Sequence, residues 1–112
     1  MTMSTETIIL SARIHIDSAQ HGVWRDGHLI YLPARTWTIL DSLLHHSGQL
    51  VTSEVLLAIA WPDEPGHARA DLYRHIRRIR QAIEPDPRHP QFPVTRRDLG
   101  YELLWSTDGH SR

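Results

Sequence analysis

Arginine side chains recur along one segment of this chain at a spacing that places them on one side of a helix. Apolar residues follow one another there at intervals of four, three and four, and this stripe consists of Leu72, Ile76, Ile79 and Ile83. The period predicts a helix from about Ala68 to Glu84. The five arginines of the segment lie opposite the stripe or beside it: Arg69, Arg74, Arg77, Arg78 and Arg80.

The positive charge of this segment has little internal compensation. Asp71 is its single acid before Glu84, so pairs between residues three or four apart can satisfy few of the arginines. Like charges on one helix face repel each other and lower its stability unless an anionic partner is present. The alternative is an ordinary solvated face. The pattern favours DNA or another polyanion, because guanidinium groups bind phosphates and guanine in a bidentate manner.

A second cationic pair lies further along the chain. Arg96 and Arg97 stand between two runs expected to be strands, Phe92–Thr95 and Tyr101–Trp105, with Gly100 in the expected turn. A connector rich in proline precedes this hairpin. An arginine at the tip of a β-ribbon can reach a minor groove, while a helix fits the adjacent major groove.

Other elements must position these arginines. Short runs rich in β-branched and aromatic residues predict four antiparallel strands at Ile8–Leu10, Arg13–Asp17, Val23–Arg25 and His28–Leu32. Asp26-Gly27 fits a tight turn between the last two strands, because glycine tolerates positive φ. Helical periodicity predicts two further helices, about Ala34–His46 and Ser53–Ala60, the second capped by Thr52. We expect one domain over residues 8–105, with tails at 1–7 and 106–112.

Length and composition limit the class of protein. The 112 residues, 40% of them hydrophobic, fit one globular domain, and the absence of cysteine excludes disulfides and thiolate chemistry. The net charge is −1, but residues 1–66 carry −4 and residues 67–112 carry +3. The longest apolar run, Val55–Trp61, is too short to span a membrane, and the start lacks the basic region of a signal peptide. We expect a cytoplasmic protein that does not enter a membrane.

Nine histidines raise the question of a metal site. His45 and His46 are adjacent, so on a helix their side chains diverge by about 100°. Neither an HExxH motif nor a glycine-rich phosphate loop is present. We therefore expect no metal ion, no cofactor and no enzymatic activity.

Four segments in this order and spacing carry a recognisable pattern: LPARTWTILDSLL, QLVTSEVLLAIAW, LYRHIRRIRQAIEP and VTRRDLGYELL. They resemble the winged-helix DNA-binding domain of the OmpR/PhoB family of bacterial response regulators. The resemblance implies an α+β fold: a winged helix-turn-helix with an N-terminal antiparallel four-stranded sheet, three helices and a C-terminal β-hairpin wing. It also implies sequence-specific binding of double-stranded DNA and transcriptional regulation, with helix 68–84 in the major groove and wing 93–104 at the minor groove.

The resemblance assigns residues to the DNA interface as well. They come from the recognition helix, the wing and the end of the second helix: His75, Arg77, Arg78, Arg80, Thr95, Arg97 and Trp61. Two of these residues have an equal alternative. For Trp61 it is a place in the core, and for His75 it is a half-buried, hydrogen-bonded role within the domain. Loop 62–66 corresponds to the loop that family members use to contact RNA polymerase or to arrange a tandem partner on DNA.

This chain departs from the family pattern where the third helix begins. Ala70-Asp71 replaces a common Arg-Thr pair, and Arg74 replaces a commonly apolar residue. Because Arg74 points outward, we add it to the expected DNA contacts. Thr36 stands where an acid is common, and Asp98 would repel phosphate unless it holds Arg97. Response regulators carry a receiver domain ahead of this module, so we expect an isolated effector domain or a regulator without a receiver.

A function of another class is also compatible with the arginines. A winged helix can serve as a protein–protein adaptor or anti-regulator whose arginine face binds an acidic protein. Such an adaptor has no reason to bind random duplex DNA with a steep salt dependence. That measurement therefore separates the two functions.

Overall fold

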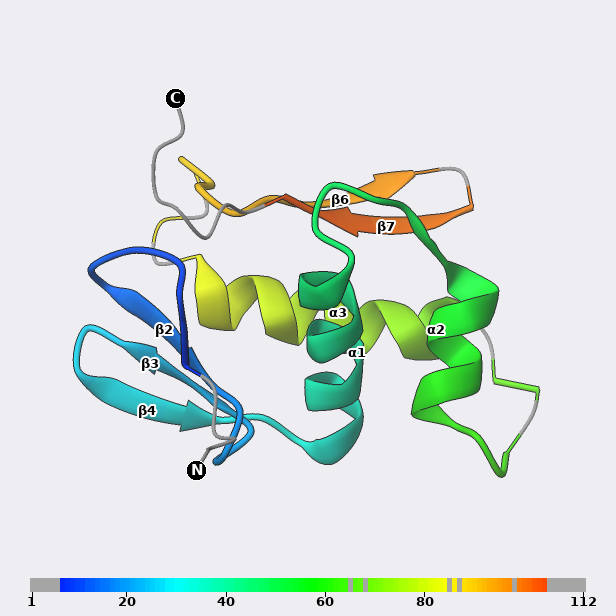
Figure 1. Cartoon of the computed structure of the whole chain (residues 1–112). Helices are drawn as coiled ribbons and strands as arrows, with labels where there is room; N and C mark the ends of the chain where they lie inside the picture. The colour runs from blue at the N-terminus through cyan, green and yellow to red at the C-terminus, as the bar shows by residue number, and fades with distance from the viewer. Residues whose placement is uncertain are drawn as a thin grey trace.

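A computed structural model describes residues 7–64, 66–67, 69–84, 86, 88–97 and 99–104. Apart from Thr7, the expected tails lie outside these residues, as do Trp105 at the end of the last expected strand and Ala68 at the expected start of the third helix. Over the described residues, a four-stranded sheet is followed by three helices and a second, smaller sheet (Figure 1). This order confirms the predicted α+β winged-helix architecture.

The N-terminal sheet is antiparallel, with neighbouring strands adjacent in sequence. Its members are β1 (Thr7–Ile9), β2 (Ile14–Asp17), β3 (Gly22–Arg25) and β4 (His28–Tyr31). The turn between β3 and β4 has positive φ at both central residues, 52° at Asp26 and 84° at Gly27, as the predicted tight hairpin requires. Alternation along β2 buries Ile14 and Ile16, and Val23 of β3, which pairs with Ile16, is buried too. One face of the sheet therefore contributes to the core.

The helices are α1 (Ala34–His45), α2 (Ser53–Ala60) and α3 (Arg69–Ile83). The hydroxyl of Thr52 accepts the backbone N–H of Val55 at 3.1 Å, which confirms the expected cap of α2. In Figure 1, α3 crosses the molecule behind α1, with the wing above it and the N-terminal sheet at its C-terminal end. The predicted stripe of α3 is fully buried in this position.

The second sheet contains the wing, β6 (Val94–Arg97) and β7 (Gly100–Leu103), and a short strand that the sequence analysis missed, β5 (Val51–Thr52). Its order is β5-β7-β6. Arg96 and Arg97 belong to β6, whereas we expected them in the turn. They pair with Tyr101 and Gly100, so the ladder continues closer to the tip than expected. A Cβ at Gly100 would overlap the carbonyl oxygen of Val51, so glycine allows β5 to approach β7.

A buried carboxylate fastens the connector between α3 and the wing. The side chain of Glu84, just after α3, accepts the backbone N–H groups of Gln91 at 2.9 Å and Phe92 at 2.6 Å. Glu84 is only 7% exposed, and the side chain of Phe92 enters the core. The proline-rich connector is therefore anchored to the C-terminal end of α3, which sets where β6 begins.

We expect the substitution Glu84→Gln to lower the free energy of unfolding by about 1–3 kcal/mol, because a carboxamide presents its NH2 group to one of the two N–H donors. Urea denaturation followed by circular dichroism measures this loss. Glu54→Gln, the same change at an exposed position in the first turn of α2, is the matched control and has a smaller effect. Equal losses in the two variants would contradict the anchoring role.

Candidate nucleic-acid interface

Arg77 and Arg78 provide positive charge on the outward side of α3. Both side chains are exposed. Neither forms a hydrogen bond or ion pair with any residue that the structure describes. Burial of the opposite stripe holds their Cα atoms on this side, so both guanidinium groups are available to an external anion.

Arg74 is also exposed, with 76% of its side chain accessible, but it has an internal partner. Its Nη2 donates to Oδ1 of Asp71 at 2.6 Å, one turn earlier on α3. The two residues are three apart, a spacing at which side chains on a helix meet. Arg74 therefore faces solvent in a defined direction instead of moving independently.

Arg80 is used inside the molecule. Its Nε and Nη2 both donate to the backbone carbonyl of Val94, at 3.1 and 2.7 Å. The residue is half-buried, and the two bonds connect α3 to the first residue of β6. The family resemblance gives Arg80 a DNA contact, whereas in the structure its guanidinium group is directed at the wing.

His75 lies half-buried between α1, α2 and α3. Its Nδ1 is 2.7 Å from the hydroxyl of Thr36, which is fully buried, and its ring meets that of Trp61 at an angle of 64°, with 5.5 Å between centroids. Burial lowers the pKa of His75 below its usual value, and the charge of Arg78 adds to the effect. A neutral imidazole adds no positive charge to the interface. The position fits the half-buried alternative for His75.

Trp61 is buried, with 7% of its surface exposed. The ring of His67 stacks on it at 4.4 Å between centroids, and the guanidinium carbon of Arg35 lies 5.2 Å from its centroid. Of the two alternatives for Trp61, this position matches the place in the core. Beyond Trp61, the described residues of loop 62–66 are exposed: Pro62, Asp63, Glu64 and Gly66.

The wing presents its charge from β6. Thr95 and Arg96 are exposed, and Arg97 forms an ion pair with Glu102 on β7, with 3.0 Å between Nη2 and Oε1. Among the described residues, the acid that contacts Arg97 is Glu102. Asp98, which we considered for that role, lies outside the described residues.

A hollow of about 250 Å³ separates the first half of α3 from the wing. Its lining combines arginine, tyrosine and small residues: Ser53, Arg69, Ala70, Tyr73, Arg96, Arg97 and Tyr101. Arg69, Tyr73 and Arg96 are not among the DNA contacts expected from the sequence. The spacing of Arg69 and Tyr73 puts them side by side on the helix, but only the docking of the wing brings Arg96 opposite them.

The described residues contain no group of three or more His, Asp or Glu side chains arranged to hold a metal ion. No helix among them is long and apolar enough to cross a membrane.

Comparison with known proteins places this fold and these residues in a family. The family model described as transcriptional regulatory protein, C terminal, matches residues 27–103. The sensory transduction protein RegX3 of Mycobacterium leprae (strain TN) is 31% identical over 99 residues, which make up 88% of this chain and 50% of that protein. RegX3 of Mycobacterium tuberculosis (strain ATCC 25618 / H37Rv) is also 31% identical over 99 residues, or 44% of its length. This chain thus spans half or less of these curated relatives.

Solved structures agree with this assignment. The response regulator DrrB of Thermotoga maritima, described as an OmpR/PhoB homolog, superposes with a TM-score of 0.71 and is 33% identical, covering 87% of this chain and 44% of that one. The RstA DNA-binding domain of Klebsiella pneumoniae, solved in complex with the RstA box, has a TM-score of 0.66 at 24% identity and covers 88% of this chain and 97% of that one. The chain belongs to the family of transcriptional regulatory protein C-terminal domains, and it is an effector domain of the OmpR/PhoB type.

Proposed function

We propose that this domain regulates transcription by binding specific sites on double-stranded DNA, with α3 in the major groove and the wing at the adjacent minor groove. The observation that carries the proposal is the pair of exposed arginines Arg77 and Arg78, which have no partner among the described residues and lie on a helix whose opposite side is fully buried. The hairpin β6–β7 lies beside the same helix and adds Arg96 and Arg97. A helix and a ribbon that are both cationic fit two neighbouring grooves of one duplex.

The proposal divides the arginines by task. Arg74 and Arg78 point outward from α3, where a guanidinium can make a bidentate contact with guanine. Arg77 and Thr95 contact phosphates, and Arg97 enters the minor groove. Arg80 acts from within by holding β6 against α3 through the carbonyl of Val94.

His75 and Trp61 also act from within the domain in this proposal. Their rings pack against each other, and the hydrogen bond between His75 and Thr36 joins α3 to α1. They support the recognition helix and do not contact phosphate themselves. The resemblance further supports a contact between loop 62–66 and RNA polymerase, for which the exposure of Asp63 and Glu64 leaves the surface open.

Salt dependence tests the proposal directly. Because each neutralised phosphate contributes about −0.9 to the slope of log K against log salt, about six contacts give a slope near −5. Fluorescence anisotropy with a random-sequence duplex between low and moderate salt measures this value. A flat titration would overturn the DNA-binding proposal and favour the adaptor.

Two substitutions separate base reading from backbone binding. Arg78→Ala removes an outward guanidinium of α3, so affinity for a selected operator falls by about 1–3 kcal/mol while affinity for random duplex changes less. Arg97→Ala weakens both duplexes more evenly and lowers the salt slope by about one unit. The operator comes from selection out of a random duplex pool.

The control for folding is Ile79→Ala, which costs about 2–5 kcal/mol of stability and weakens binding only through unfolding. Thermal melts of all variants identify such losses. If Arg78→Ala and Arg97→Ala reduce operator and random binding by the same factor, α3 does not read bases.

Assembly gives a further expectation. One module of this size covers roughly 600–1,000 Å² of its own surface and reads few base pairs, so specificity requires two copies on one site. We expect head-to-tail binding to a direct repeat, with half-sites about one helical turn apart, by a chain that is mainly monomeric without DNA. Analytical ultracentrifugation with and without the selected duplex measures this. A stable symmetric dimer on a palindrome is the contradicting result.

A further inference from the structure

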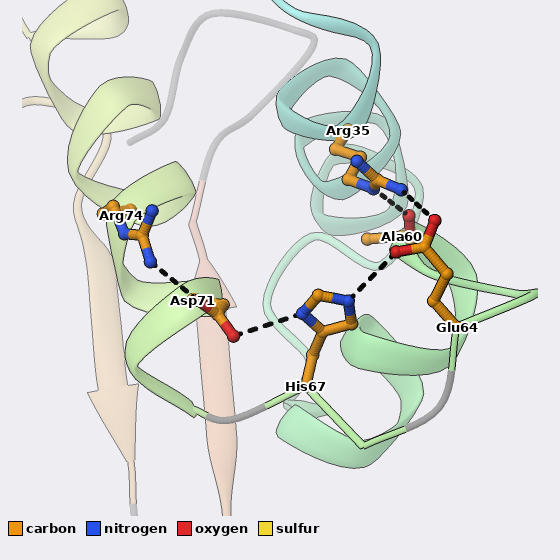
Figure 2. A network of polar contacts seen from close by, with 6 residues as sticks. All are labelled: Arg35, Ala60, Glu64, His67, Asp71 and Arg74. Atoms are coloured by element: carbon orange, nitrogen blue, oxygen red, sulfur yellow. Dashed lines mark hydrogen bonds and ion pairs between the residues drawn. The ribbon is translucent and has the colours of Figure 1, made fainter.

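A network of polar contacts connects α1, the loop before α3 and the outward face of α3. Figure 2 shows its side chains in order, each directed at the next. They are Arg35, Glu64, His67, Asp71 and Arg74. The first member of the network is held in place, because Nε of Arg35 donates to the carbonyl of Ala60 at the end of α2, at 2.9 Å.

His67 lies in the middle of this network, and each of its ring nitrogens contacts a carboxylate oxygen. Its Nε2 lies 3.2 Å from Oε1 of Glu64, and its Nδ1 lies 3.2 Å from Oδ2 of Asp71. The ring also stacks on Trp61 with an interplanar angle of 22°. Contacts at both edges and on one face leave the imidazole little rotational freedom, so it is a firm support for Asp71.

Asp71 connects His67 to the exposed side chain of Arg74. One carboxylate oxygen contacts His67, and the other accepts from Nη2 of Arg74 at 2.6 Å. The side chain of Asp71 is 30% exposed, while that of Arg74 is 76% exposed. A carboxylate fixed on its inner side therefore fixes the direction of an arginine on its outer side.

Stability alone does not account for this arrangement. An exposed ion pair contributes about 0–1 kcal/mol, and a carboxylate near the DNA-binding face repels phosphate. The benefit lies in binding, because holding an arginine beforehand reduces the conformational entropy lost when it meets a base. Of the five N–H donors of Arg74, one is occupied by Asp71, which leaves enough for a bidentate contact with guanine.

We propose that Asp71, held in place by His67, is a positioning residue that sets sequence specificity by orienting Arg74 toward a guanine in the major groove. This inference rests on the proposed DNA-binding function. It gives a role to Asp71, a negatively charged residue on a helix face whose arginines attract anions. Glu64 and Arg35 extend the support to α1 and to the end of α2.

Asp71→Asn tests the proposal because two of its consequences have opposite signs. Removing a negative charge near phosphates raises affinity for a random-sequence duplex. Releasing Arg74 lowers the preference for the selected operator over random duplex by about threefold or more, a part of the discrimination carried by one bidentate contact. An acid that acts only through its charge raises both affinities equally and leaves the preference unchanged, and that result overturns the proposal.

Two further variants define the mechanism. Glu54→Gln is the matched control, because it removes an exposed carboxylate of α2 outside this network, and it leaves the operator preference unchanged. His67→Ala withdraws the support without changing the acid, so it lowers the preference with no gain in random binding. Thermal melts show whether each variant is folded at the assay temperature.

A double-mutant cycle decides whether the effect passes through Arg74. In an Arg74→Ala background, Asp71→Asn has no further effect on the operator preference. If the two effects on the preference multiply independently, Asp71 does not act through Arg74 and the positioning role is overturned while DNA binding stands. If the unaltered domain itself shows a flat salt titration, the proposed function fails and the positioning role fails with it.

Discussion

Burial of one side of α3 is the constraint on which the interface depends. Leu72, Ile76, Ile79 and Ile83 are fully buried, and each stabilises the fold by about 1.5–3 kcal/mol. Repulsion between neighbouring guanidinium groups costs only a few tenths of a kcal/mol per pair. Burial therefore outweighs repulsion, and the helix keeps a cationic face that its own electrostatics oppose. Fixing the stripe also fixes the direction in which every other side chain of α3 leaves the helix.

The arginines divide into structural and available groups. Arg25, Arg35 and Arg80 each donate to a backbone carbonyl near the end of a helix or the start of a strand. A guanidinium suits this use because it presents several donors in a fixed geometry. Arg77 and Arg78 have no such partner among the described residues. Some arginines of the chain therefore hold its own elements together, and one of them, Arg80, helps to place the wing.

Most of the architecture could be predicted from local patterns. The Asp26-Gly27 turn, the Thr52 cap and the period of the α3 stripe are signals that neighbouring residues carry by themselves. Strand β5 could not be found in this way, because two residues leave no period and its ladder is completed by β7 from a distant part of the chain. For the same reason β6 extends to Arg97, since pairing with β7 determines where a strand ends.

The candidate nucleic-acid interface likewise combines features that follow from local sequence patterns with features that depend on tertiary contacts. The sequence by itself determined that α3 has an apolar side and an arginine side, because a 3.6-residue period needs only the order of residue types. It also determined that Asp71 could pair with Arg74, because the two are one turn apart. Only the tertiary structure decided that Arg80 binds the wing, that His75 meets Thr36, and that His67 stands between Glu64 and Asp71. These contacts join separate elements, and their geometry exists only after the core has packed.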